Sequence, residues 1–178
     1  MPRMSVVSFR APVLSDEAAV IEAQRIMERE GFDFALDYAL GEDFAAWVDR
    51  TEAFRLGRGL PEGMVPATFE LAIVDDQVTG RLSVRHSLNE WLLLKGGHIG
   101  YGVLPAFRRR GIGTRLLQRG LEITKSLGVS KALVTCDADN IPSRRIIEAA
   151  GGVYESDYLQ PGVSVPTRRY WIGVTKAG

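Results

Sequence analysis

The stretch Arg108-Arg109-Arg110-Gly111-Ile112-Gly113-Thr114 lies between an extended apolar run and a stripe of apolar residues at helical spacing. Its two glycines allow the backbone to approach a ligand closely, and the first turn of a helix offers unpaired N–H groups at the positive end of its dipole. Three arginines add formal charge. The stretch therefore predicts a turn that binds an anion and opens a helix, and phosphate is the expected ligand.

The overall composition makes this turn stand out as a local patch of charge. The chain has 178 residues, of which 46% are hydrophobic and 25% charged, as is typical of a soluble globular protein. This length favours a single domain over residues 1–178. The 22 basic and 22 acidic residues balance, which argues against a broad surface for nucleic acid or for a membrane.

Cysteine and histidine are too scarce for a disulfide or a metal site. The one cysteine, Cys136, excludes an internal disulfide and fits a reducing compartment. His86 and His98 form no cluster with the spacing of metal ligands, so we expect no metal. The N-terminus lacks the apolar region of a signal peptide, and the apolar runs are too short to span a bilayer. We therefore expect a cytoplasmic protein.

Strand and helix patterns alternate along the chain. Helices are predicted from an N-cap at Ser15 to a stop at Gly31, over residues 43–56, from Ile112 to a stop at Gly128, and over 143–150. Strands are predicted over residues 5–10, 68–74, 78–86, 98–104, 131–137, 153–158 and 168–174. The breaker-rich residues 57–63 indicate an internal loop, because residues 1–56 hold too few apolar positions to fold alone.

Two local connections follow from these patterns. Residues 75–77 join two β-prone runs and predict a hairpin. The run 98–104, the helix that begins at Ile112 and the run 131–137 predict a right-handed parallel crossover. The anion-binding turn then lies at the carboxyl end of the first of these strands, where α/β folds bind ligands.

The spacing of the glycines excludes two common phosphate-binding loops. A nucleoside-triphosphate loop needs a glycine, four residues, and then Gly-Lys followed by Ser or Thr, and the chain has no such string. A dinucleotide fingerprint needs a third glycine where this chain has Leu116. We therefore expect neither nucleotide fold.

The spacing that is present resembles the acetyl-coenzyme A signature of the GNAT superfamily of N-acetyltransferases. The pattern is Arg108-x-x-Gly111-x-Gly113, preceded by Val103-x-Pro105 and followed by a leucine-rich helix, with Asn140 and Ser143 further along. Residues 97–103 and 135–140 also resemble a bacterial branch of acetyltransferases without a settled substrate. The resemblance is strongest over residues 98–152.

The resemblance implies an α/β fold and a position for the acyl donor. The expected domain has a mixed, twisted central sheet of about six or seven strands flanked by helices, with two parallel strands splayed at the cofactor site. The backbone of Val103 and Leu104 then pairs with the pantetheine arm, the N–H groups from Arg109 to Thr114 hold the pyrophosphate, and Asn140 and Ser143 contact the cofactor. The predicted cofactor-binding residues are Val103, Leu104, Arg108, Arg109, Arg110, Gly111, Ile112, Gly113, Thr114, Asn140 and Ser143.

The implied activity is transfer of an acetyl group from acetyl-CoA directly to a primary amine. The expected acceptor is a small molecule or a peptide, and a homodimer is compatible with the resemblance. Each predicted contact residue also has a structural reading: residues 108–110 can be solvated charges, Asn140 a helix cap, and Cys136 a small buried hydrophobe rather than an acyl carrier. The alternative function is a noncatalytic acyl-CoA binding or sensing module.

The proton-transfer residues depart from the family pattern. The usual tyrosine, seven residues after the asparagine, is replaced by Ile147. The substitute acid is water or one of Tyr101, Tyr154, Tyr158 and Tyr170. Tyr101 and His98 are the candidates for the base, although His98 can equally be a satisfied structural histidine. Trp47 and Phe54, in the helix predicted over residues 43–56, are expected to pack in the core. The resemblance implies that the same helix also forms a wall of the acceptor site.

Overall fold

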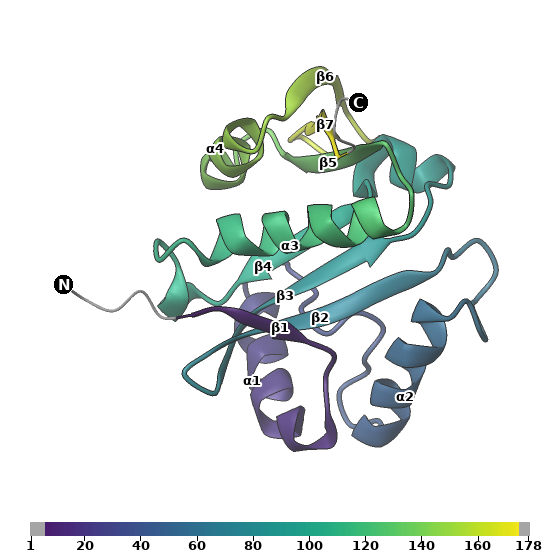
Figure 1. Ribbon diagram of the computed structural model, residues 1–178, viewed down its shortest axis with the longest axis vertical. Helices are drawn as coiled ribbons and strands as arrows, with labels where there is room; N and C mark the ends of the chain where they lie inside the picture. The colour runs from purple at the N-terminus through teal and green to yellow at the C-terminus, as the bar shows by residue number, and fades with distance from the viewer. Residues whose placement is uncertain (1–5, 175–178) are drawn as a thin grey trace.

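A seven-stranded sheet with the order β1-β2-β3-β4-β5-β7-β6 runs through the protein (Figure 1). The computed structural model describes residues 6–174. The strands are β1 (Ser8–Arg10), β2 (Ala67–Val74), β3 (Gln77–Arg85), β4 (Ile99–Val103), β5 (Lys131–Asp137), β6 (Val153–Tyr158) and β7 (Thr167–Gly173). The helices are α1 (Glu17–Glu28), α2 (Phe44–Arg55), α3 (Ile112–Ser126) and α4 (Ile141–Ala149). No helix within residues 6–174 is long and apolar enough to cross a membrane.

The predicted hairpin is confirmed in the first half of the sheet. Strands β2 and β3 pair antiparallel up to the contact between Val74 and Gln77. Asp75 and Asp76 take φ angles of 48° and 62°, the left-handed values that a tight hairpin turn needs. Strand β1 pairs antiparallel with β2, so the strand predicted over residues 5–10 is present from Ser8 on, and its first residue, Ser5, lies outside the described residues.

The predicted Ser15 cap is wrong, because the chain enters α1 through a 3-10 turn over Leu14–Asp16. Asp16 takes the N-cap position of α1. Its carboxylate accepts the Val13 N–H at 2.8 Å and two hydrogen bonds from Arg10 at 2.7 and 2.8 Å. The residue that follows the predicted cap therefore takes the N-cap position. Helix α1 ends at Glu28, and Gly31, with a φ of 73°, follows as the predicted stop.

The crossover from β4 through α3 to β5 is parallel, and its two strands separate. Their pairing register contains one residue pair, Ile99 with Val134. On its other edge β4 pairs with β3 along its length. Beyond that single pair, β4 runs on to Val103 and β5 to Asp137 without pairing to each other. The predicted mixed sheet with a splay between two parallel strands is thus confirmed.

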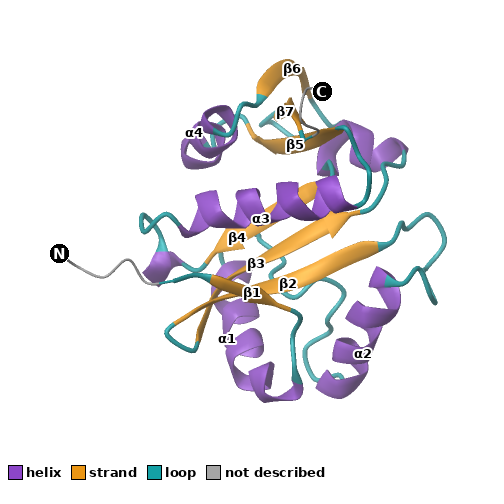
Figure 2. Cartoon of the chain, viewed as in Figure 1, coloured by secondary structure: helices purple, strands orange, loops and turns teal. Residues whose placement is uncertain are grey.

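Helices cover both faces of the sheet (Figure 2). Helices α1 and α2 pack on one face against β2 and β3, and α3 packs on the other face against β3 and β4, with α4 beside it. The alternation of strand residues divides the core accordingly. In β2, Leu71 and Ile73 belong to the cluster under α1 and α2, whereas Ala72 and Val74 belong to the cluster under α3. The splay between β4 and β5 therefore lies in the sheet between the layer of α1 and α2 and the layer of α3.

Candidate active site

A cavity of about 280 Å³ fills the splay between β4 and β5. Tyr101 and Ser143 line it from the side of α3 and α4, while Arg81 and Phe32 line it from the side of α1. The cavity therefore connects the two faces of the sheet. Its lining is completed by Arg85, Lys95, Gly96, Ile99, Gly100, Thr135, Cys136, Asp137, Asn140 and Thr167.

The predicted anion-binding turn opens α3 next to this cavity. Gly111 is the N-cap of α3 with a φ of 78°, and no side chain caps the helix. The backbone N–H groups of residues 109–114 have no acceptor among the described residues. Gly111 meets the need for a left-handed residue, whereas Gly113 allows close packing, since a Cβ there would lie 2.9 Å from Ile146. Six adjacent donors at a helix N-terminus form a cradle for an anion.

The side chains of Arg108 and Arg110 in this turn differ in what they contact. Arg108 donates from Nε to the Val103 carbonyl at 3.0 Å and pairs at 2.5 Å with Glu30, in the turn that follows α1. The guanidinium of Arg110 lies 5.5 Å above the Phe107 ring. Arg108 therefore ties the turn after α1 to the end of β4, and its charge is offset by a carboxylate. The cofactor contact predicted for its side chain stays a prediction.

The backbone pairing of Val103 and Leu104 with the pantetheine arm stays a prediction, but the two residues differ in which of their backbone groups are already engaged. The Leu104 N–H donates to the Thr79 carbonyl at 2.9 Å, and the Leu104 carbonyl accepts the Phe107 N–H at 2.9 Å. Because N–H groups alternate along a strand, the Val103 N–H points away from β3 and toward the splay. Ile112 belongs to the core, with 3% of its surface exposed, so only its N–H is placed to meet a ligand.

Asn140, Ser143 and Tyr101 meet across the splay. The Asn140 side chain accepts the Ser143 N–H at 3.2 Å and caps α4. The Ser143 hydroxyl lies 3.0 Å from the Tyr101 hydroxyl. Burial raises the pKa of Tyr101 to about 12, so its phenol stays protonated at neutral pH. Tyr101 therefore suits the donor of a proton better than the base for which the sequence also proposed it.

Tyr101 is the one member of the four predicted tyrosines that lines either cavity of the described structure. Tyr170 lies in the core and donates to the Glu148 carboxylate at 2.8 Å. Tyr154 packs edge-to-face on Tyr170. Ile147, at the position of the family's tyrosine, is fully buried in the core. The sequence could not rank these tyrosines because their directions depend on how β4, α4 and β7 pack.

Cys136 lines the splay, but its environment does not activate it. Burial raises the pKa of its thiol to about 11. At neutral pH the thiol stays protonated, and a protonated thiol is a poor nucleophile. This supports the reading of Cys136 as a small buried side chain over an acyl carrier.

His98 lies directly before β4 and lines neither cavity. The ring Nδ1 of His98 accepts the Leu133 N–H at 2.9 Å, and the backbone N–H of His98 donates to the Leu133 carbonyl at 2.8 Å. The residue is 5% exposed, and burial lowers its pKa, which favours the neutral ring. These contacts give His98 a structural role in joining β4 to β5, while a catalytic role stays a prediction.

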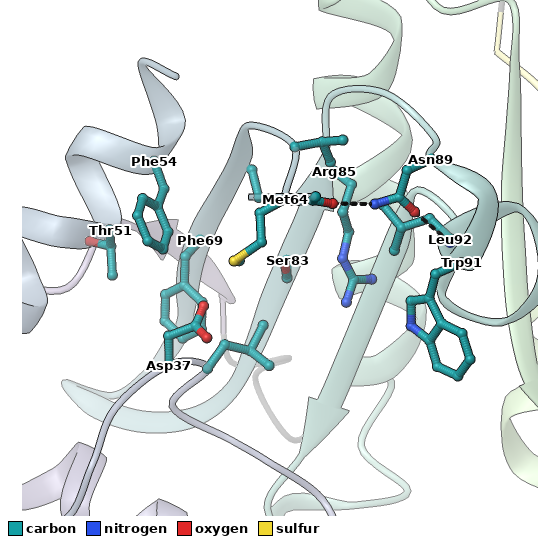
Figure 3. Close-up of a pocket in the computed structure, with 14 residues that line it drawn as sticks. Asp37, Thr51, Phe54, Met64, Phe69, Ser83, Arg85, Asn89, Trp91 and Leu92 are labelled. Atoms are coloured by element: carbon teal, nitrogen blue, oxygen red, sulfur yellow. Dashed lines mark hydrogen bonds between the residues drawn. The ribbon is translucent and has the colours of Figure 1, made fainter. Parts of the chain in front are cut away.

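A second cavity of about 340 Å³ opens on the face of α2 (Figure 3). Thr51 and Phe54 of α2 line it, in keeping with the expectation that this helix walls an acceptor site, whereas Trp47 lies in the core. Asp37 lines the far side of the cavity from Arg85 (Figure 3). Burial and the nearby Asp33 carboxylate raise the pKa of Asp37. The remaining lining is Leu36, Gly63, Met64, Val65, Ala67, Phe69, Ser83, Asn89, Trp91 and Leu92.

Arg81 and Arg85 are site residues that sequence reasoning missed. Both lie on β3, and Arg85 lines both cavities. The signal was present in the sequence, because Thr79, Arg81, Ser83 and Arg85 alternate with apolar residues and glycine along one strand. An arginine on a strand that helices cover on both faces is a polar side chain placed in the interior, which calls for a functional reason.

Among residues 6–174, no group of three or more histidine, cysteine or acidic side chains could hold a metal ion.

Comparison with known proteins agrees with this architecture. The model of the Acetyltransferase (GNAT) family matches residues 27–151. No curated protein matches the chain. RimJ from Mycobacterium smegmatis, solved in complex with CoA-disulfide, is similar with a TM-score of 0.69 and 19% identity over 96% of this chain and 83% of that chain.

Two structures from Salmonella typhimurium are also similar. An acetyltransferase that modifies the N-terminal serine of a 50S ribosomal subunit protein has a TM-score of 0.67 and 18% identity over 94% of both chains. The protein yncA, solved with its cofactor acetyl-CoA, has a TM-score of 0.65 and 16% identity over 96% of this chain and 95% of that chain. At these identities the similarity shows the fold alone.

Proposed function

The chain belongs to the acetyltransferase (GNAT) family, and from this premise we propose that it transfers an acetyl group from acetyl-CoA directly to a primary amine. The observation that carries the proposal is that a cradle of free backbone N–H groups lies next to the splay cavity. Six backbone N–H groups without acceptors, in residues 109–114, lie at the start of α3, and β4, the strand that precedes this turn, forms one wall of the splay cavity. A polyanion with a long, uncharged arm fits this combination.

The residues present fit coenzyme A. The N–H groups of residues 109–114 would hold its pyrophosphate, and the Val103 N–H would pair with the pantetheine arm in the splay. Asn140 and Ser143 lie on the opposite wall of the same cavity. When bound, acetyl-CoA supplies an activated acetyl thioester whose thiolate is the leaving group.

The side chains of the two cavities then divide the proton transfers. The acceptor amine forms the new C–N bond as the C–S bond breaks, and it must lose a proton. We call the second cavity, of about 340 Å³, the acceptor cavity. We assign this proton to Asp37, through a chain of water molecules across the acceptor cavity, because Asp37 is the carboxylate that lines it and its raised pKa makes it a better base than an ordinary aspartate. Tyr101, whose phenol stays protonated, would donate to the thiolate.

Direct transfer is favoured over a covalent acyl-enzyme by the state of Cys136. Its thiol lies in the splay with a pKa raised to about 11, so it offers little thiolate at neutral pH. A Cys136→Ala variant should therefore keep most of the acetyl-transfer activity, and loss of that activity in a folded variant would contradict direct transfer.

The experiment that tests the proposal measures free thiol released from acetyl-CoA with a panel of primary amines. The panel should contain amino acids, amino acid amides, polyamines and short peptides with free N-termini. Release that depends on the amine, together with a product heavier by one acetyl group in mass spectrometry, is the expected result. Thiol release without amine measures hydrolysis and is subtracted.

The sensor alternative gives a different outcome in the same experiment. Ile147 in place of the family's tyrosine is the observation that favours it. A folded protein that binds acetyl-CoA in calorimetry but acetylates no amine of the panel would contradict the transfer proposal and support the sensor.

A further inference from the structure

Strand β3 carries two arginines, the buried Arg81 and the partly buried Arg85, that have no carboxylate at ion-pair distance among the described residues. Neither Arg81 nor Arg85 forms an ion pair with any described residue. Burial lowers the pKa of both, and for Arg81 the neighbouring charge of Arg85 lowers it further, to about 9. Both guanidinium groups are still protonated at neutral pH. Charges taken out of water in proteins are usually paired, so these two neighbouring cations call for an anion.

Arg81 has its contacts inside the protein, whereas Arg85 has few. Arg81 donates to the Gly100 carbonyl at 3.2 Å and to the Asp33 carbonyl at 2.9 Å, and it stacks 4.3 Å over the Phe32 ring. Arg85 donates one long hydrogen bond of 3.4 Å to the Gly96 carbonyl. Its other guanidinium nitrogens have no acceptor among the described residues, which leaves them free for a ligand.

Arg85 lies where the splay cavity meets the acceptor cavity, since it lines both. Figure 3 shows its guanidinium group reaching into the acceptor cavity beside Ser83. The Ser83 side chain also lines that cavity and has no hydrogen-bond partner among the described residues. Gly100 leaves room for the arginine, because a Cβ there would lie 2.9 Å from Arg85 Nη1.

We propose that Arg85, with Ser83 beside it, binds an acidic group of the acceptor, so that the acceptor is an amino acid or a related amino phosphonate. This inference rests on the proposed acetyl transfer. The acid must lie close to the reacting amine, because Arg85 borders the splay through which the acetyl group arrives. An amine and an acid separated by one or two carbon atoms meet this condition.

The rest of the acceptor cavity suits an apolar remainder of such a molecule. Phe54 and Phe69 line the part of the cavity away from Arg85 (Figure 3), and Leu36 and Met64 add further apolar lining. An arginine that binds a carboxylate or phosphonate makes charge-assisted hydrogen bonds, often two at once. These give both affinity and orientation, so the amine is presented to the thioester in one geometry.

The phosphates of coenzyme A do not account for Arg85. Their cradle in residues 109–114 opens α3, which packs on the opposite face of the sheet from α1 and α2. Arg85 faces the side of the sheet that holds Arg81 and Phe32, where the acceptor cavity opens. A variant of Arg85 should therefore leave the affinity for coenzyme A unchanged.

The test compares matched acids and amides on the wild type, Arg85→Gln and Arg85→Lys. The probes are L-phenylalanine with L-phenylalaninamide, and L-alanine with 1-aminoethylphosphonate, assayed by thiol release. The measured quantity is the ratio of kcat/KM for acid over amide, compared between variants, so the different pKa values of the two amines cancel. Arg58→Gln, at an exposed arginine outside both cavities, is the matched control.

We expect Arg85→Gln to lower the acid-to-amide ratio by about tenfold to a hundredfold, as loss of a charge-assisted hydrogen bond does. Arg85→Lys should restore part of the ratio, and Arg58→Gln should leave it unchanged. The alanine and aminophosphonate arm then shows which acid the site prefers. An acid-to-amide ratio that is the same in Arg85→Gln and in the wild type overturns the proposal, and so does a loss of coenzyme A affinity in Arg85→Gln.

A second measurement separates this inference from the proposed function. If the wild type acetylates no amine, acetyl transfer fails, and binding decides the inference. N-acetyl-L-phenylalanine and its amide are then titrated calorimetrically into the protein saturated with coenzyme A. Tighter binding of the acid in the wild type, lost in Arg85→Gln, supports an anion site at Arg85. Equal binding of acid and amide in the wild type overturns it.

Discussion

Replacing Gly111 with Asp or with Asn isolates the charge of the anion cradle. Gly111 has a φ of 78°, and a Cβ there would meet no atom within 4 Å, so a short side chain enters open space. Asp and Asn both tolerate left-handed backbone and have nearly the same size. The two variants therefore share the cost of replacing the glycine and differ in one negative charge beside the six free N–H groups.

The expected effect follows from that charge. A carboxylate about 4 Å from a phosphate oxygen costs roughly 1 kcal/mol in water and about 4 kcal/mol where the effective dielectric constant is near 20. Gly111 is exposed, so the lower part of this range applies. We expect Gly111→Asp to bind coenzyme A about tenfold to a hundredfold more weakly than Gly111→Asn, which corresponds to roughly 1–3 kcal/mol.

Calorimetric titration with coenzyme A measures the difference, and pantetheine, which lacks the phosphates, is the control ligand. Pantetheine should bind the two variants equally. The difference for coenzyme A should shrink as salt is raised, because the interaction is exposed to solvent. Equal affinity of the two folded variants for coenzyme A would refute the assignment of residues 109–114 as the pyrophosphate cradle.

Three further predictions concern proton transfer and packing. Tyr101→Phe should lower kcat by about a hundredfold with little change in KM, and wild-type kcat should show no loss from Tyr101 below pH 10, because its pKa is about 12; an unchanged kcat would exclude it as the proton donor. His98→Leu should leave kcat nearly unchanged but cost about 1–3 kcal/mol in urea unfolding, because the ring accepts a buried backbone N–H. Since the folded-state pKa of His98 lies below the unfolded value, its contribution to stability is present above pH 6.5 and falls as pH drops, a slope that the variant should lose. Gly120→Ala should cost about 1–3 kcal/mol, because its Cβ would lie 2.8 Å from Ile99 Cγ2, whereas Gly173→Ala, with no atom within 4 Å, should be nearly neutral in the same measurement.

Elements whose signals are local were predicted closely. The strand over 131–137 is β5 with the same bounds, and the strand over 153–158 is β6. The helix over 43–56 is α2, one residue shorter at each end, with Asp43 as its cap. Periodicity, capping residues and turn residues are properties of neighbouring positions, so a sequence displays them directly. The cap predicted at Ser15 is absent, because the contact between Arg10 and Asp16 outweighed the capping preference of serine.

The candidate site divides in the same way. The turn at residues 109–114 was visible because glycine spacing and a helix start are local. Arg108 was predicted to face the cofactor, yet it pairs with Glu30, which is 78 positions away in sequence. Alternation along β3 gives the face of Arg85 but not what lies opposite that face. Arg85 lines two cavities because of where α2 and the segment that follows β3 pack.

The sequence by itself determined the strands and helices, the hairpin, the crossover and the backbone donors of the anion turn. These depend on φ preferences, side-chain periodicity and unpaired groups at a helix end, all of which are set within a few residues. Tertiary structure alone decided that β7 lies between β5 and β6, that β4 and β5 pair at one residue pair and then part, and that Tyr101 meets Ser143 across the gap. The physical reason is that strand order and side-chain partners arise from burying apolar faces between segments far apart in the chain, and such contacts leave no fixed spacing in the sequence.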